Sequence, residues 1–212
     1  MQEYWDELFL DIHNQRIIND EMNSRETDDS WMNWSVEECI HGLESGHLTG
    51  KDEQEWRVTE NSLYEGRLIL HLPESFTENH QMRIDQSSES IPSYMFQDKP
   101  QQTVIGVKPI IEKINEDQVN RILDRMLEQT KQAQPNMEIM TRDILYMDAA
   151  DTNIPYYETV FLLKPDPFMQ ILFIRTLAER SFIVSMQFKL ENVAHWQPLA
   201  HAICCSMRWL EE

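Results

Sequence analysis

The sequence predicts an α+β protein in which one antiparallel β-sheet is packed with helices as an α/β/α sandwich, preceded by a short helical N-terminal extension. Segments between residues 137 and 189 alternate apolar and polar residues with a period of two, and short polar turns separate them. Strands joined by such short turns pair antiparallel. Apolar residues at helical spacing occur before this run and again after it.

The chain also divides by charge. Residues 1–60 hold 16 acidic and 4 basic residues, whereas residues 61–212 hold 21 and 14. We therefore predict an acidic helical extension over residues 1–60 and one α+β domain over residues 64–212. With 212 residues, 41% of them hydrophobic, the chain has enough apolar material for such a core.

Two short helices are expected in the extension. From Trp5 onward, residues 1–23 place apolar side chains at helical spacing, and residues 23–35 are polar and indicate a linker. Ser35 with Glu38 three positions later forms a capping box for the second helix, and Gly42 is expected near its end.

The domain is expected to begin with a strand over residues 67–73, which Pro73 ends, and a hairpin around residues 98–100. A capping box at Asn115 and Gln118 then starts a helix that Pro135 ends. Four strands follow, over residues 137–147, 156–163, 168–177 and 180–189. An amphipathic helix from Trp196 to Leu210 closes the chain, with one apolar stripe against the sheet.

This order of elements resembles the PsbP-like and DcrB-like superfamily of antiparallel α/β/α sandwiches, over roughly residues 64–212. The likeness rests on the strand ending at Leu72-Pro73 with Phe76 soon after, on the central helix, on the run of strands, and on the closing sequence Trp196-Gln197-Pro198-Leu199. Known members are photosystem subunits, nuclear-transport cofactors, envelope lipoproteins and secretion-effector chaperones. The resemblance therefore implies a binding module, and it transfers no functional residue position by position.

Composition excludes several classes of function. A net charge of −19 repels phosphate backbones, so we expect no nucleic-acid partner. No run of about 18 apolar residues exists, and the N-terminus has no secretory signal, so we expect no membrane insertion. Three cysteines, two of them adjacent, do not form a disulfide framework. A cytoplasmic location follows as an expectation.

The residues that could bind a metal or act in catalysis are better explained as packing or turn residues. Cys39, His41 and His47 do not match the ligand spacing of a zinc site, and Asp148, Asp151 and Asn153 lack the glycine and the final acid of a calcium loop. His201 and Cys204 are three residues apart on one helix, but a Cys–His catalyst also needs an oxyanion hole and an orienting group. We therefore expect no catalytic residue, metal or cofactor, and no enzyme.

Aromatic residues are the candidate contacts with a partner, because aromatic side chains are enriched at the centres of interfaces. These candidates are Trp5, Trp31, Trp34, Trp56, Tyr156 and Tyr157. The alternative is that they pin the N-terminal helices onto the sheet.

The working hypothesis is a non-catalytic cytoplasmic protein-binding module, an adaptor or secretion chaperone, that takes a protein partner and also forms a homodimer. One alternative is an immunity-type protein that neutralises a basic partner, which requires a clustered acidic face. Another is a small hydrolase or ligand-binding protein with a pocket between sheet and helix, which requires converging polar groups there.

Overall fold

The computed structural model describes residues 34–50, 55–79, 93–110, 114–147, 152–163 and 165–210. Residues 33–212 belong to one compact unit. The helix predicted within residues 1–23 and the candidate contacts Trp5 and Trp31 lie outside the described residues.

Three α-helices, one 3₁₀-helix and eleven strands make up the described part of the chain. In order these are α2 (Val36–Ser45), β1 (His47–Thr49), β2 (Glu55–Leu63), β3 (Leu68–Pro73), β4 (Thr77–Glu78), β5 (Tyr94–Asp98), β6 (Thr103–Ile110), α3 (Glu116–Ala133), β7 (Met137–Met147), β8 (Thr152–Phe161), β9 (Phe168–Leu177), β10 (Arg180–Lys189), η3 (Leu190–Asn192), α4 (Val193–Ser206) and β11 (Arg208–Trp209). The predicted α+β class is confirmed.

The strands form two antiparallel sheets, not the one sheet predicted. The large sheet has the order β4-β5-β6-β10-β9-β8-β7, and the small sheet has the order β1-β2-β3-β11. The β5–β6 and β7–β8–β9–β10 hairpins have the predicted antiparallel pairing. Strands β1 and β2 were not predicted, because β1 has only three residues and the alternation that starts β2 gives way to the polar run Glu60-Asn61-Ser62.

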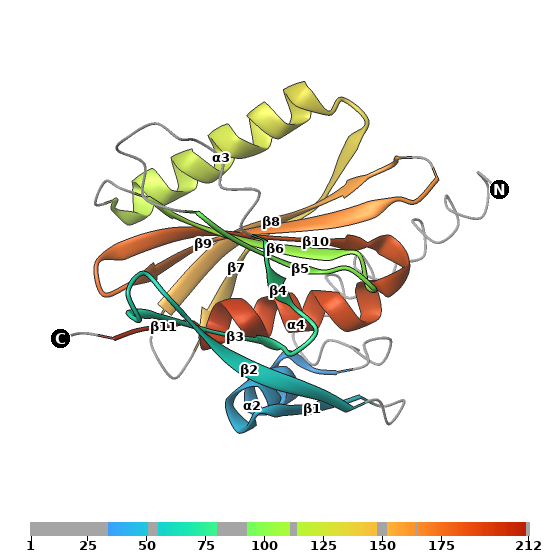
Figure 1. Cartoon of the computed structure of the whole chain (residues 1–212). Coiled ribbons are helices and arrows are strands. Elements are labelled where there is room, and N and C mark those ends of the chain that lie inside the picture. The colour runs from blue at the N-terminus through green and yellow to red at the C-terminus, as the bar shows by residue number, and fades with distance from the viewer. Residues whose placement is uncertain are drawn as a thin grey trace, which may run out of the picture. The chain divides into compact units, whose positions relative to one another are not determined.

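The layers are plain in Figure 1: α3 covers one face of the large sheet, and α4 covers the opposite face. Beyond α4 lie α2 and the small sheet, so α4 is enclosed between the two sheets. Every residue of α4 from Trp196 to Ser206 is buried. The α4 face is therefore the sealed side of the large sheet.

The domain boundary predicted near residues 60–64 does not coincide with the edge of this unit. β2 pairs with β3 from Val58↔Pro73 to Leu63↔Leu68, and α2 packs on α4. Residues 34–63 therefore share a core with the rest, because the small sheet cannot form without β2.

Helix α2 starts as predicted, with Ser35 accepting from the Glu38 amide and Glu38 accepting from the Ser35 amide. It ends later than predicted, at Gly46, whose φ of 86° is in the left-handed region that favours glycine. Gly42 serves a different purpose: a Cβ there would lie 2.8 Å from the His47 carbonyl oxygen. Gly42 thus allows α2 to pack closely against β1.

The closing helix differs most from its prediction. α4 starts at Val193, so Pro198 lies inside the helix and not in its first turn. It stops at Ser206, and Arg208 and Trp209 form β11, paired with Ile69 and Leu68 of β3. The predicted helical stripe to Leu210 was wrong at this end, because pairing with the small sheet takes the chain out of the helix.

Candidate functional site

A cleft of about 430 Å³ opens on the other, less covered face of the large sheet, between the C-terminal half of α3 and the strands beneath it. The helix and its C-cap residue supply Met126, Gln129, Thr130, Ala133 and Gln134, and the sheet supplies Phe161, Phe168, Gln170 and Gln187. The volume falls within the range of roughly 300–1,000 Å³ that is typical of ligand sites.

The cleft exists because the apolar core between α3 and the sheet is short. Val119 and Leu123, from the first half of the helix, pack on Tyr157, Leu172 and Ile174 of the sheet. Further along, Met126 and Leu127 are only partly buried against this cluster, and the sheet presents half-buried Gln170 and Gln187 in place of large apolar residues. The packing between helix and sheet is therefore less complete where the cleft opens.

Two phenylalanines form the floor of the cleft at the β8–β9 turn. The rings of Phe161 and Phe168 are stacked, with centroids 4.6 Å apart and planes at 13°. Phe161 is buried, whereas Phe168 is partly exposed. Stacked aromatic surface is apolar and rigid, so it suits an apolar group placed against it.

The walls carry hydrogen-bonding groups without charge. Gln129, Gln134, Gln170 and Gln187 each offer an amide that can donate and accept. Thr130 is partly engaged, because its hydroxyl donates to the Met126 carbonyl at 2.8 Å. Among the described residues that line the cleft, none has a titratable side chain. The cleft can therefore bind an uncharged group and has nothing to activate a nucleophile.

Exposed apolar side chains follow the cleft residue Phe161 in the sequence. Leu162 and Leu163 follow Phe161 in the β8–β9 turn and are 41% and 44% exposed. The Leu163 amide donates to the Phe161 carbonyl at 2.9 Å, which fixes this turn. Exposed apolar side chains of this kind are common at protein-binding sites.

The opposite, sealed face of the sheet holds a buried polar cluster. Gln197 Nε2 of α4 donates to Glu158 Oε1 of β8 at 2.6 Å, and His201 Nε2 lies 3.3 Å from the same oxygen. The His201 ring packs edge-on against Tyr156 and Phe173. Glu158 is 0% exposed, so no substrate reaches these groups. His201 therefore lies across the sheet from the cleft and contributes no group to it.

The cysteines belong to the same sealed side. Cys39, Cys204 and Cys205 are buried, free thiols. Burial raises the pKa of the Cys39 thiol to about 12 and that of the Cys205 thiol to about 11, and it also raises the pKa of Cys204. A nucleophilic cysteine needs a lowered pKa and access to solvent. The structural interpretation of Cys204 is therefore the better one.

Most of the predicted partner contacts pack inside the molecule. The Trp34 ring meets Trp56 at 5.2 Å, and Trp56 meets Trp196 of α4 at 5.1 Å. Trp34, Tyr156 and Tyr157 are buried, and Trp56 is half-buried. The three buried residues pack in the core of this chain, and the role of the set as partner contacts stays a prediction.

The metal candidates do not come together. Within the ranges that the structure describes, no group of three His, Cys, Asp or Glu side chains is placed to hold a metal ion. Cys39 is buried in α2, whereas His41 and His47 are exposed. Asp148 and Asp151 lie outside the described residues.

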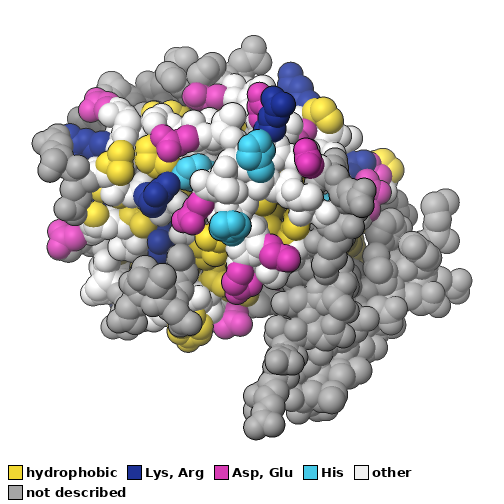
Figure 2. All heavy atoms as spheres, turned by 90° about the horizontal axis from the view of Figure 1, so that it is seen from below, with side chains coloured by type: hydrophobic (Ala, Val, Ile, Leu, Met, Phe, Trp, Pro, Cys, Tyr) yellow, Lys and Arg dark blue, Asp and Glu magenta, His cyan; other side chains and the backbone are white. Residues whose placement is uncertain are grey.

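Acidic residues do not gather into one patch on the face formed by α2, β1 and β2. Figure 2 shows acids on this face spread among histidine, basic and apolar side chains.

A second hollow of about 430 Å³ lies between the small sheet and the β5–β6 turn, and Glu55, Arg57 and Glu74 line it. Its buried acid, Asp98, already accepts from the Ser75 hydroxyl and the Gln101 amide.

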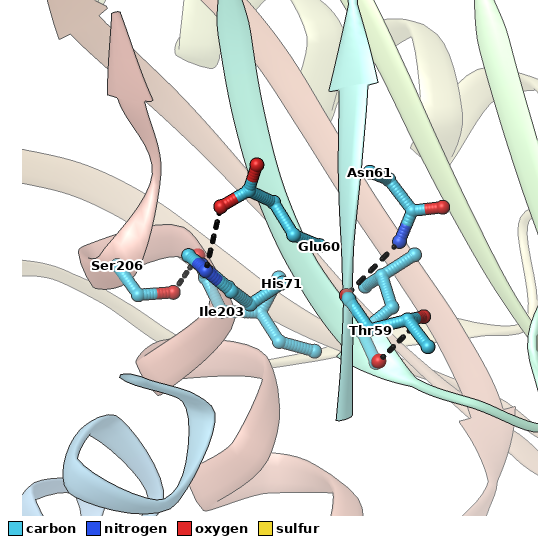
Figure 3. Close-up of polar contacts among 7 residues, drawn as sticks. Thr59, Glu60, Asn61, His71, Ile203 and Ser206 are labelled. Carbon is cyan, nitrogen blue, oxygen red and sulfur yellow. Dashed lines mark hydrogen bonds and ion pairs between the residues drawn. The ribbon is translucent and has the colours of Figure 1, made fainter. Parts of the chain in front are cut away.

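One titratable group in the small sheet is enclosed. His71 of β3 points toward Glu60 of β2, with 3.7 Å between Nε2 and Oε2, near Ser206 at the end of α4 (Figure 3). Desolvation lowers the pKa of His71, and Arg208 adds to the effect while Glu60 and Glu44 oppose it. His71 is therefore a pH-sensitive part of the scaffold.

Comparison with solved structures supports the predicted fold. The solution structure of cyanobacterial PsbP from Synechocystis aligns with a TM-score of 0.55 and 10% identity, over 72% of this chain and 92% of that one. LpqN, involved in cell envelope biogenesis of Mycobacterium tuberculosis, aligns at 0.43 and 9% over 84% and 99%. PA94 from Pseudomonas aeruginosa, a protein of unknown function, aligns at 0.37 and 10% over 66% and 89%.

At 10% identity, the likeness to PsbP concerns the fold alone, and the PsbP-like fold implied by the resemblance is confirmed. No protein-family model matches the sequence, and no curated protein sequence matches it. Among the described residues, no helix has the length and apolar character needed to span a membrane.

Proposed function

We propose that this chain is a non-catalytic, cytoplasmic protein-binding module that holds an uncharged, apolar segment of a partner in the cleft beneath α3. The observation that carries the proposal is the uncharged lining of this cleft in a chain of net charge −19. Apolar side chains of the partner would rest on Phe161 and Phe168, and the glutamine amides would pair with its peptide groups.

An adaptor or secretion chaperone is the specific role we favour. Such proteins hold an apolar segment of another protein away from water until it is delivered. Leu162 and Leu163, which follow the cleft residue Phe161 in the sequence, are exposed and would offer further apolar surface to such a segment. The buried Glu158 cluster contributes to the scaffold and not to binding.

The test fills the cleft without disturbing the fold. Ala133 is the last residue of α3 and is exposed, so Ala133→Trp places a large ring at the mouth of the cleft. Gln132→Trp is the matched control, because Gln132 is also exposed and does not line the cleft. Each variant is used for affinity purification from the native host and compared with the wild-type chain.

We expect wild type and Gln132→Trp to retain the same partner near one-to-one, and Ala133→Trp to lose it at least tenfold. The binding segment is then synthesised as a peptide and titrated against both variants. Recovery of equal partner by Ala133→Trp, or repeated failure to recover any partner with wild type under gentle conditions, contradicts the proposal.

A small neutral ligand is the second candidate occupant, and the volume of the cleft favours it. Native mass spectrometry of the purified chain distinguishes the two. A bound small molecule that leaves with Ala133→Trp and not with Gln132→Trp would replace the protein segment as the occupant.

A further inference from the structure

The outer edge of β7 has no partner strand among the described residues. β7 ends the order of the large sheet, pairs with β8 on one side only, and is 11 residues long. The opposite edge strand, β4, has only two residues. Natural proteins usually shorten or charge their edge strands, because an open edge templates pairing with another chain.

Apolar side chains are exposed along this edge. Tyr146 is 69% exposed and Ile139 is 44% exposed. Between them the strand carries one basic and one acidic residue, Arg142 and Asp143, so it is close to neutral in a strongly acidic chain. A bulge in the pairing with β8 between Ile139 and Thr141 protects the first half of the edge, so the regular stretch from Arg142 onward is the part that can pair. Within it the Ile144 amide donates to Asp143 Oδ1 at 2.8 Å, a local bond that a pairing strand would replace.

The register of β7 against β8 assigns its side chains to faces. Arg142 stands opposite Tyr157, whose side chain is in the core under α3, and Arg142 Nη2 lies 2.8 Å from Asp124 Oδ1 of that helix. Arg142, Ile144 and Tyr146 therefore share the α3 side of the sheet. Asp143 and Leu145 stand on the α4 side, opposite Tyr156 and Ile154.

We infer that this edge pairs with the same edge of a second copy of the chain, antiparallel, about a two-fold axis at Ile144. A two-fold axis perpendicular to the sheet keeps each side chain on its own face, so residue 144 meets itself, 143 meets 145 and 142 meets 146. Arg142 of each copy then lies opposite Tyr146 of the other, and Ile144 lies opposite Ile144.

Neighbouring registers are less favourable. An axis at residue 142 or 143 places Arg142 or Asp143 opposite its own copy, and like charges directly opposite destabilise a sheet. An axis at residue 145 leaves Arg142 without an opposite residue on the described strand. The register at Ile144 alone gives both long exposed side chains of this face, Arg142 and Tyr146, a cation–π partner.

The dimer adds to the proposed function and does not depend on it. Because the axis is perpendicular to the sheet, both α3 helices and both clefts lie on the same side of one continuous sheet. Two clefts held on one side engage two segments of a partner at once, which raises the apparent affinity.

Cysteine cross-linking of the full chain tests the register. Cα atoms directly opposite in an antiparallel pair are about 4.5–5.5 Å apart, within disulfide reach. Ile144→Cys should therefore give a disulfide-linked dimer on mild oxidation. Leu145→Cys, whose two copies are offset by two residues along the strands, should not. Wild type is the background control, because its three cysteines are buried.

Light scattering tests the dimer itself. We expect about twice the monomer mass of 25.3 kDa, and a dissociation constant that falls as salt rises, because screening weakens repulsion between two copies of charge −19. Tyr146→Arg puts a second cation opposite Arg142 and should raise the dissociation constant of the dimer at least tenfold. The double variant, Tyr146→Arg with Arg142→Glu, places opposite charges across the interface and should recover dimerisation.

A monomer at high salt overturns the inference, as does a cross-link with Leu145→Cys and not with Ile144→Cys. A second outcome also overturns the inference. In it the chain alone is monomeric, and a different protein binds the β7 edge of wild type but not that of Tyr146→Arg. The cleft is tested separately, because Ala133→Trp leaves β7 unchanged. Loss of the dimer with retention of the partner would therefore refute this inference and leave the proposed function standing.

Discussion

The two faces of the large sheet are built from the same strands and differ in almost every other respect. On the α4 side, a helix buried on all sides encloses a carboxylate, a histidine and three thiols. On the α3 side, an amphipathic helix covers part of the sheet and leaves a cleft lined by neutral amides. The thiols and the Glu158 carboxyl are thus enclosed, whereas the described residues that line the cleft have no titratable side chain.

The contrast shows that polar side chains on the two faces are satisfied in different ways, by protein partners on one face and by water on the other. A buried carboxyl requires partners, so Glu158 accepts from Gln197 and lies beside His201. A polar residue on a half-covered face is satisfied by water, so Gln170 and Gln187 need no such cluster. A change to one face should therefore cost stability, whereas a change to the other should cost binding.

The largest expected effect is on Glu158. Glu158→Ala removes the acceptor of the Gln197 amide and leaves a cavity, so we expect a loss of about 3 kcal/mol or more in the free energy of unfolding. Glu158→Gln keeps an acceptor oxygen and should cost less. Gln170→Ala, on the next strand and the other face, should cost under about 1 kcal/mol. Urea unfolding of the three variants checks this; equal losses for Glu158→Ala and Gln170→Ala would contradict the contrast.

The cysteine thiols should be labelled much more slowly in the native chain than in the unfolded chain. With a pKa of about 11, the Cys205 thiolate at pH 8 is about a hundredfold scarcer than at the usual thiol pKa of 9.0, and burial blocks access besides. We expect labelling by an aromatic disulfide reagent to be at least a hundredfold slower in buffer than in urea. Fast labelling of a thiol in the folded chain would mean that the α4 side opens to solvent.

The third prediction concerns pH. Because the pKa of His71 is lowered from 6.5 in the folded state, the unfolded chain binds its proton first. Stability should be constant above about pH 7 and fall as the pH drops below 6.5 toward the folded-state pKa. His71→Asn should remove that part of the slope between pH 7.5 and 5.5 in urea unfolding, while the carboxylates stay ionised. An unchanged slope would show that His71 is not its source.

The smallest effect is expected at the ion pair between α3 and β7. The Arg142 and Asp124 side chains are 43% and 50% exposed, so solvent screens them and their coupling should be about 0.2–1 kcal/mol. A double-mutant cycle with Arg142→Ala and Asp124→Ala measures it at a protein concentration low enough to exclude association. A coupling above 2 kcal/mol would mean that α3 is held to the sheet much more tightly than its cleft suggests.

The sequence predicted the elements whose signals are local. Asn115 and Gln118 mark the start of α3 in the sequence and form a capping box in the structure. The apolar alternation of β9 and β10 gave both strands with the observed bounds. Signals that depend on distant partners were missed: β2 is recognisable only beside β3, and β11 only because β3 has a free side.

The candidate site was less predictable for the same reason. Tryptophan and tyrosine were expected at a partner surface, but composition does not say whether an aromatic residue meets a partner or its own core. Trp34 and Tyr157 turned out to be core residues. The useful signal was weaker: Gln170 and Gln187 stand on the same face as apolar Leu172 and Ile183 of the predicted strands, and they mark where that face stops being core.

The pairing of β11 with β3 has a consequence for folding. Leu68 and Ile69 pair with Trp209 and Arg208, which lie far from them along the chain. Contacts between residues so far apart in sequence form late, because closing a long loop costs entropy before the contact stabilises anything. Until β11 pairs, one side of β3 stays open, and an open strand exposed during folding favours aggregation. Removal of Arg208 and Trp209 should therefore lower the yield of folding before it lowers the stability of the finished fold.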